Sequence, residues 1–213
     1  MPVDVKICGL TNAADAAAAI RFGADYLGFV LYAGSRRGID ADTLMRVLDN
    51  LDGDYRAVGV FVNESRKRVE AIAQKAGLSA VQLHGAEHPE DFAGFPVPVW
   101  RVVAVNADGA HPDPAVWPAA RYVVDASVPG RYGGTGITAD WAAAADLAQQ
   151  APVMLAGGLT PANVMRAIDR VNPLGVDVAS RIERAPGKKN LDLMNTFIKA
   201  AKGWDIDDEP GTR

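Results

Sequence analysis

The sequence predicts a single (β/α)8 barrel, and two observations lead to this fold class. Short runs rich in β-branched residues alternate with Ala-rich amphipathic stretches along nearly all of the 213 residues, and eight such units can be counted. The runs recur about every 20 to 30 residues, as parallel strands joined by crossover helices require. Eight alternating units favour a closed barrel, because the eighth strand then pairs with the first and leaves no sheet edge.

The predicted strands are short apolar runs that end near a glycine or a polar residue. They are Val3–Cys8, Tyr26–Leu31, Arg56–Val62, Ala80–Leu83, Val99–Val105, Tyr122–Asp125, Val153–Ala156 and Gly175–Val178. An open, doubly wound sheet is the alternative, but that fold usually has fewer strands and a G-x-G-x-x-G turn after the first. The first run continues into "CGLTNAAD", which is not that turn, so the closed barrel is favoured.

Six of the intervening stretches have a clear helical period. They are Asn12–Phe22, Asp40–Leu51, Ser65–Ala76, Ala139–Gln150, Pro161–Val171 and Leu191–Lys202. Pro161 supplies a helix start signal and Gly77 a stop signal. The stretches after the fourth and fifth strands, "HPEDFAG" and "PDPAVWPAA", are short and interrupted by proline, so only short, broken helices are expected there.

We expect the barrel to fill residues 1–203 as one catalytic domain, because a chain of this length can bury one sizeable core. The last ten residues, "WDIDDEPGTR", lose the helical period and gather acidic side chains, so residues 204–213 are predicted to form a mobile tail. The glycine-rich stretch "PGRYGGTGITADW" is predicted to be a mobile loop over the barrel mouth.

Composition argues against several classes of partner. The formal net charge of −4 disfavours nucleic acid, which usually meets a basic surface. No apolar run of about 18 residues is present to span a membrane, and "MPVDVKICG" lacks the pattern of a signal peptide. The single cysteine, Cys8, has no internal disulfide partner, so a cytoplasmic location is expected. Whether the chain is a monomer or a homodimer is left open.

Strand parity places a set of polar side chains inside the barrel. On the first strand Val3, Val5 and Ile7 form the helix-facing set, which leaves Lys6 and Cys8 on the inner face. The same parity predicts these further inner residues: Gln82, His84, Arg101, Asp125 and Asp177. A lone cysteine is more often buried filler, and a strand-end aspartate is often a cap. Because these polar groups share one face and one end of the barrel, we interpret them as an active-site mouth.

Two glycine-containing stretches follow the last two strands, at the position where barrels of this type bind phosphate. They are "AGGLTPANV" and "DVASRIERAPGKKN". Backbone N–H groups at Gly157 and Gly158, together with the segment around Ser180 and Arg181, could cradle a phosphate dianion. The substrate is therefore expected to carry a phosphate group.

A longer series of motifs resembles one enzyme family, the phosphoribosylanthranilate isomerases of tryptophan biosynthesis. The motifs fall in the family's order and cover the chain up to about residue 202: "KICGLT", "GADYLGFV" with "SRR", "VGVFVN", "VQLHG", "DASVPGRYGGTG", "LAGGLTPANV" and "GVDVAS" with "PGKK". The resemblance implies a (β/α)8 barrel that isomerises N-(5-phosphoribosyl)anthranilate to 1-(2-carboxyphenylamino)-1-deoxyribulose 5-phosphate without cofactor or metal.

The resemblance also implies roles for individual residues. Cys8 is expected to be the general base, Asp125 the general acid, and Arg37 the ligand of the anthranilate carboxylate. From their inner-face positions, His84 and Asp177 are expected to contact the substrate. An Amadori rearrangement needs such an acid to open the furanose ring and a base to remove the C2 proton. Lys6 is a candidate to lower the Cys8 pKa, and burial or Asp177 could raise that of Asp125.

The sequence departs from the family's usual pattern at a few positions, and two rival functions remain open. The departures are Arg36, Ile137, Ala179, Arg181 and Asn190. Of these, Arg181 puts a side chain where close backbone approach to phosphate is expected. The first rival is another phosphosugar barrel, such as the histidine-pathway aldose–ketose isomerase or a dual-substrate relative. The second is a non-catalytic phosphosugar-binding barrel. Cys8 argues against the first, which generally uses a pair of aspartates, and intact Cys8 and Asp125 argue against the second.

Overall fold

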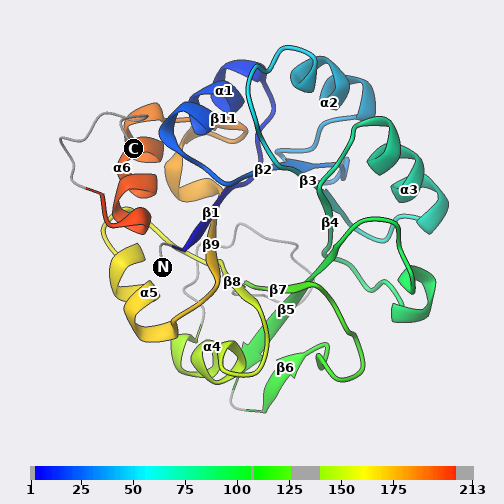
Figure 1. Cartoon of the computed structure of the whole chain (residues 1–213), viewed down its shortest axis with the longest axis vertical. Helices are drawn as coiled ribbons and strands as arrows, with labels where there is room; N and C mark the ends of the chain where they lie inside the picture. Colours follow the sequence, from blue (N-terminus) through cyan, green and yellow to red (C-terminus); the bar gives the residue numbers. More distant parts are fainter. Residues whose placement is uncertain (1–2, 107, 126–139, 205–213) are drawn as a thin grey trace.

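A computed structural model describes residues 3–106, 108–125 and 140–204. Eight parallel strands close into a barrel, as predicted (Figure 1). These strands are β1 (Asp4–Ile7), β2 (Tyr26–Val30), β3 (Ala57–Phe61), β4 (Ala80–Leu83), β5 (Val99–Asn106), β7 (Arg121–Val124), β8 (Val153–Leu155) and β9 (Gly175–Val178). The barrel closes because β1 pairs with both β2 and β9, and β4 pairs with β5.

Helices surround the barrel on its outside (Figure 1). They are α1 (Ala13–Phe22), α2 (Ala41–Leu48), α3 (Arg66–Lys75), α4 (Trp141–Ala148), α5 (Val164–Val171) and α6 (Leu191–Lys202). Side chains of Asn12, Asp40 and Asn190 accept the hydrogen bonds that cap α1, α2 and α6. Asn190, one of the departures noted above, thus has a role as the N-cap of α6.

The segments after β4 and β5 depart from the helix–strand alternation. A single 3₁₀ turn, η1 (Pro89–Phe92), follows β4, in place of the expected broken helix. Between β5 and β7 the described residues form no helix; instead β6 (Gly109–His111) pairs antiparallel with β5. The prolines of "HPDP" and "WPAA" explain the difference, because they lack the N–H groups that a helix needs. The buried Trp117 fills the space, and its Nε1 donates to the Glu87 carbonyl.

Two hydrophobic cores confirm most of the predicted strand parity. Val5 and Ile7 belong to the outer core between strands and helices, whereas Lys6 points into the barrel. The second core is the barrel interior and consists of eight buried residues: Tyr26, Val58, Ala80, Trp100, Val102, Val123, Met154 and Ala156.

The predicted inward orientation of Arg101 is wrong. Its neighbours Trp100 and Val102 belong to the barrel interior, so Arg101 points to the other face of β5. There its Nη1 lies 2.7 Å from Glu87 Oε2, and its Nη2 donates to the Gly85 carbonyl. Trp100 takes the inward position because a large aromatic ring fills the barrel, while the guanidinium finds a carboxylate outside.

The amino-terminal end of the barrel is closed by ion pairs. Arg121 Nη1 lies 2.7 Å from Asp4 Oδ2, and its guanidinium lies over the rings of Tyr26 and Trp100. Arg56 also lies over Tyr26, with its guanidinium 4.0 Å from the ring centroid. These charges seal one end, which leaves the carboxyl ends of the strands as the open end.

Two sequence predictions fall largely outside the described residues. Trp204, the first residue of the predicted tail, packs against Gly23 at the end of α1, but residues 205–213 are not described. The predicted mobile loop lies mostly in 126–139, which is also not described, and α4 begins just after it. Within the described ranges there is no helix long and apolar enough to cross a membrane.

Candidate active site

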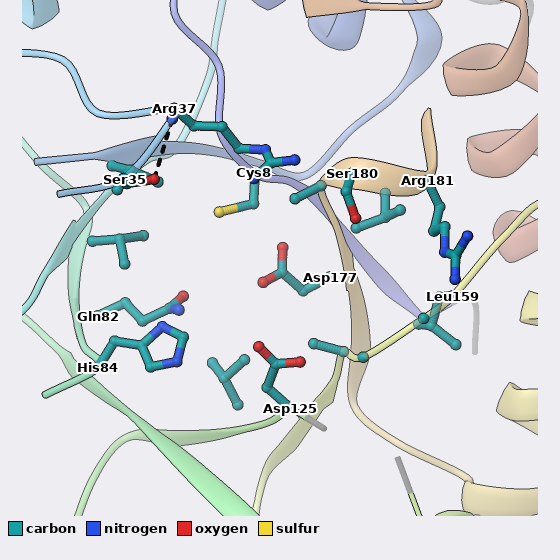
Figure 2. Close-up of a pocket in the computed structure, with 18 of the residues that line it drawn as sticks. Cys8, Ser35, Arg37, Gln82, His84, Asp125, Leu159, Asp177, Ser180 and Arg181 are labelled. Atoms are coloured by element: carbon teal, nitrogen blue, oxygen red, sulfur yellow. Dashed lines mark hydrogen bonds between the residues drawn. The ribbon is translucent and has the colours of Figure 1, made fainter. Parts of the chain in front are cut away.

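One cavity opens at the carboxyl ends of the strands (Figure 2). The structure brings every sequence-predicted site residue to its wall: Cys8, Arg37, His84, Asp125, Gly157, Gly158, Asp177, Ser180 and Arg181. Figure 2 shows Cys8 and Asp125 on opposite sides of the cavity, with Asp177 between them. The cavity therefore presents a thiol, two carboxyl groups and two guanidinium groups within one site.

Cys8 follows β1 directly and is fixed by its backbone, whose N–H donates to the Val178 carbonyl of β9 at 2.8 Å. One glycine makes room for Cys8, and a second makes room for Arg37. A side chain at Gly28 on β2 would place its Cβ 3.0 Å from Cys8 Sγ. Gly9 has a φ of 73°, and a Cβ there would lie 2.5 Å from Arg37 Cδ. The glycine that ends the first apolar run is thus required by the stem of Arg37, which crosses it.

A buried ion pair lies beside Cys8 at the level of the strands. The parallel register of β1 and β9 sets Lys6 opposite Asp177, and Lys6 Nζ lies 3.0 Å from Asp177 Oδ2. Burial alone would lower the Lys6 pKa, but the charges of Asp177 and Cys8 and their hydrogen bonds raise it by more. Lys6 therefore stays an ammonium ion inside the barrel.

The Cys8 thiol has a raised pKa, so the expectation of a lowered pKa is wrong. Burial is the largest cause, because it disfavours the thiolate. Lys6 acts in the predicted direction and lowers the pKa, but the Asp177 carboxylate raises it. The ammonium group of Lys6 is shared with Asp177, so it stabilises the thiolate less than an unpaired lysine would.

His84 lies just after β4, where its backbone N–H donates to the Phe61 carbonyl. Burial first, and then the charges of Arg101 and Lys6, lower its pKa to about 4. The imidazole is therefore neutral at physiological pH and can offer a hydrogen bond but no charge.

Two buried oxygen atoms on the cavity residues have no partner among the described residues. They are Gln82 Oε1 and Asp177 Oδ1. Both residues line the cavity, so they add an amide and a carboxylate to its wall. Gln82 appeared in the predicted inner set but not among the predicted site residues.

Arg37 lines the cavity, and its guanidinium is held by Glu183, a residue that the sequence analysis missed. Its Nε donates to Glu183 Oε1 at 2.8 Å, and its Nη2 donates to Glu183 Oε2 at 2.7 Å. Arg36 is exposed and does not line the cavity. The structure thus places the second arginine of "SRR" in the site, as the motif register predicted.

The two glycine-containing loops lie at one side of the cavity. Gly157 and Gly158 have φ values of 79° and 68°, and within the described residues their N–H groups donate to no acceptor. Ser180 and Arg181 belong to the 3₁₀ turn η2 (Ser180–Ile182), which follows β9 and lines the same cavity. Figure 2 shows the Arg181 side chain along the wall that Leu159 also lines.

Comparison with known proteins agrees with this site. A family model described as N-(5'-phosphoribosyl)anthranilate (PRA) isomerase matches residues 5–200. The N-(5'-phosphoribosyl)anthranilate isomerase of Pelobacter propionicus is 38% identical over 200 residues, covering 94% of this chain and 96% of that protein. The enzyme of the same name from Solibacter usitatus is 42% identical over 200 residues, covering 93% and 96%. The chain belongs to this family.

Solved phosphoribosylanthranilate isomerases share the architecture. The enzyme from Thermotoga maritima superimposes with a TM-score of 0.86 at 37% identity, covering 94% of this chain and 99% of that chain. A phosphoribosylanthranilate isomerase in complex with reduced 1-(o-carboxyphenylamino)-1-deoxyribulose 5-phosphate gives a TM-score of 0.84 at 36% identity, with the same coverage.

Several departures from the usual phosphoribosylanthranilate isomerase pattern leave the cavity intact. Arg36 lies outside the cavity, and Ala179 contributes its backbone carbonyl to a hydrogen bond from Lys189. Arg181 lines the cavity, where it adds a positive charge beside the glycine loop. Ile137 lies outside the described residues.

The raised pKa predicts how the thiol titrates. Because the chain has one cysteine, the difference in absorbance near 240 nm between the parent protein and Cys8→Ala reports the Cys8 thiolate, and the subtraction removes the contribution of the five tyrosines. We expect a midpoint above the ordinary value of about 8.5, with the thiol protonated below it and the thiolate forming above it. Lys6→Met should move the midpoint further up and Asp177→Asn should move it down. A midpoint near neutrality in the unliganded protein would contradict this assignment.

The environment of His84 predicts an unusually acidic imidazole. In NMR titrations of the folded protein, the imidazole signal that disappears in a His84→Gln variant should have a midpoint of about 4. The other two histidines of the chain, His88 and His111, supply the signals that remain in that variant. If the His84 signal titrates near the ordinary value of about 6.5, the imidazole is not desolvated as the structure has it.

Proposed function

We propose that this chain is a phosphoribosylanthranilate isomerase that acts in tryptophan biosynthesis. The observation that carries the proposal is the placement of Cys8 and Asp125 across one cavity that also holds Arg37 and a glycine-lined loop. A thiol and a carboxyl group can supply the base and the acid of an Amadori rearrangement. Family membership supports the same reaction.

In the first step Asp125 acts as the general acid. It donates a proton to the furanose ring oxygen while the C1–O bond breaks, and that oxygen becomes a hydroxyl group. The lone pair of the anthranilate nitrogen forms the C1–N double bond, giving a protonated imine. The nitrogen thus serves as the electron sink.

In the second step the Cys8 thiolate removes the C2 proton. The electrons of that C–H bond form the C1–C2 double bond, and the C1–N electrons return to nitrogen. The enol then gains a proton at C1 and loses its hydroxyl proton to become the ketone. No atom is gained or lost, as an isomerisation requires.

The raised Cys8 pKa fits this order of steps. In the empty cavity the thiol is protonated at neutral pH, because burial disfavours the anion. Ring opening creates a positive imine next to the thiol, and a nearby cation favours the thiolate. The thiolate form of Cys8 is therefore favoured after Asp125 has protonated the ring oxygen.

The remaining cavity residues supply binding groups for the three polar parts of the substrate. Arg37 binds the anthranilate carboxylate, and the ribose hydroxyls meet neutral His84 and the acceptors of Gln82 and Asp177. The phosphate lies on a surface formed by Gly157, Gly158, Ser180 and Arg181, whose N–H groups and guanidinium suit a dianion.

Two wider aspects belong to the proposal. We place the enzyme in the cytoplasm, because its lone cysteine acts as a reagent and has to stay reduced. A solved relative from Thermotoga maritima is described as dimeric, and a homodimer of this chain is tested by sedimentation velocity, which separates 22.5 kDa from twice that mass.

The decisive experiment is turnover of freshly formed phosphoribosylanthranilate, followed by its fluorescence. Cys8→Ala and Asp125→Asn should each lower kcat by about 10² to 10⁴, the range of a lost general base or acid. Their thermal unfolding should stay close to that of the parent protein. The histidine-pathway substrate, tested alongside, should not turn over. Near-normal kcat in folded Cys8→Ala would remove the cysteine from the mechanism and leave Asp177 as the next candidate base.

Arg37 and Arg36 form a matched pair for testing the carboxylate contact. Arg37→Ala should weaken substrate binding by about 1.5 to 3 kcal/mol, as expected for a lost charge-assisted hydrogen bond. Arg36→Ala, which removes an exposed side chain, should leave KM nearly unchanged. A larger effect at Arg36 would show that the carboxylate lies elsewhere.

A further inference from the structure

A small hairpin behind the cavity contacts both Cys8, the proposed base, and Arg37, the proposed ligand of the substrate carboxylate. It consists of β10 (Glu183–Ala185) and β11 (Lys188–Lys189), and the register sets Glu183 opposite Lys189. Neither residue lines the cavity. Their side chains are nevertheless buried, with 4% and 0% exposure.

Lys189 binds the backbone on both sides of the site. Its Nζ donates to the Cys8 carbonyl at 2.6 Å, to the Ala179 carbonyl at 3.0 Å and to Glu183 Oε1 at 3.1 Å. Burial lowers the pKa of Lys189 and the charge of Glu183 opposes this shift. The three acceptors match the three N–H bonds of an ammonium ion, so the geometry favours the protonated form. Its burial is compensated by this full set of partners. The ammonium therefore fixes the peptide of the proposed base to the segment that precedes the proposed phosphate contacts.

Glu183 binds Arg37 along one edge of the guanidinium, the edge formed by Nε and Nη2. The Nη1 hydrogens and the second Nη2 hydrogen are not used by Glu183, and this outer edge can receive a carboxylate. Arg37, Glu183 and Lys189 together carry one net positive charge. That charge matches a single substrate carboxylate.

The hairpin itself is anchored away from the cavity. The Lys189 backbone N–H donates to Asp15 Oδ2 at 2.9 Å, and Thr11 Oγ1 donates to the Gly187 carbonyl at 2.5 Å. Both anchors lie at the start of α1 or just before it. The positions of Glu183 and Lys189 are thus set by the barrel frame and do not depend on a bound substrate.

We infer that Glu183 and Lys189 are positioning residues that act as one unit, Glu183 through Arg37 and Lys189 through the backbone of Cys8. The inference rests on the proposed roles of Arg37 and Cys8. Glu183 holds the guanidinium with its free edge available to the substrate carboxylate. Lys189 holds the Cys8 peptide so that the sulfur faces C2.

Two double-mutant cycles test this unit, because a residue that acts through another loses its effect once the other is removed. Glu183→Gln should raise KM about tenfold with little change in kcat, whereas Lys189→Met should lower kcat by about tenfold or more with a smaller change in KM. In the Arg37→Ala background, Glu183→Gln should change kcat/KM by less than about twofold. In the Cys8→Ala background, Lys189→Met should change the residual kcat by less than about twofold.

Controls separate positioning from general stability. Lys188→Met alters the exposed neighbour in the same strand and should leave kcat and KM unchanged. Lys189→Arg keeps the charge and several donors, so it should recover part of the lost kcat. If Lys189→Met does not fold, the Glu183 cycle decides by itself, since glutamine keeps the shape of glutamate.

The outcomes distinguish this inference from the proposed function. Suppose that Arg37→Ala and Cys8→Ala are damaging, but Glu183→Gln and Lys189→Met cause the same fold-losses in those backgrounds as in the parent protein. Glu183 and Lys189 then have only a structural role, and the inference is overturned. If Arg37→Ala and Cys8→Ala leave turnover intact, the proposed roles fail and the inference falls with them.

Discussion

The buried ion pair between Lys6 and Asp177 joins the first barrel strand to the last. It forms only when the barrel closes, because β1 and β9 meet in register across 171 residues of sequence. Burying two charges is unfavourable unless they are paired and their remaining groups are satisfied. The parallel register brings Lys6 Nζ within 3.0 Å of Asp177 Oδ2, so each buried charge is compensated by the other. Closure of the fold and preparation of the site are thus one event.

Space inside the barrel constrains the site as strongly as charge does. Lys6 and Cys8 occupy the inner face of β1 and the position just after it, and Gly28 on β2 leaves them room, since a Cβ there would lie 3.0 Å from both side chains. Below them the interior is filled by rings and aliphatic groups, and the amino-terminal end is sealed by Arg121 and Arg56. Water and ligands can therefore approach the thiol only from the carboxyl ends of the strands.

The sequence predicts the closed barrel and the cavity residues because both depend on local patterns. A period of two separates the inner from the outer residues of β1, and strand ends are marked by glycine or aspartate. The orientation of Arg101 could not be predicted in this way, because it depends on Trp100 filling the interior and on Glu87 lying outside. Polarity alone is a poor guide to which face a strand residue occupies.

Long-range contacts explain what else the sequence analysis missed. Glu183 and Lys189 belong to a stretch interpreted only as a phosphate loop, and their partners Arg37 and Cys8 lie more than a hundred residues away in sequence. The direction of the Cys8 pKa likewise depends on burial and on how Lys6 divides its charge between Asp177 and the thiol. A lysine close to Cys8 in the sequence shows that its charge can lower the Cys8 pKa. The sequence does not show whether this effect exceeds that of burial.

The protonated thiol has a consequence for binding as well as for chemistry. The proposed substrate carries a phosphate and a carboxylate, and the cavity already contains the carboxylate of Asp177. A thiolate in the empty site would add a further negative charge and repel this ligand. Burial keeps Cys8 neutral during binding, and the imine cation favours the thiolate only after ring opening. The same desolvation that makes the cysteine a poor base at rest therefore allows an anionic substrate to bind beside it.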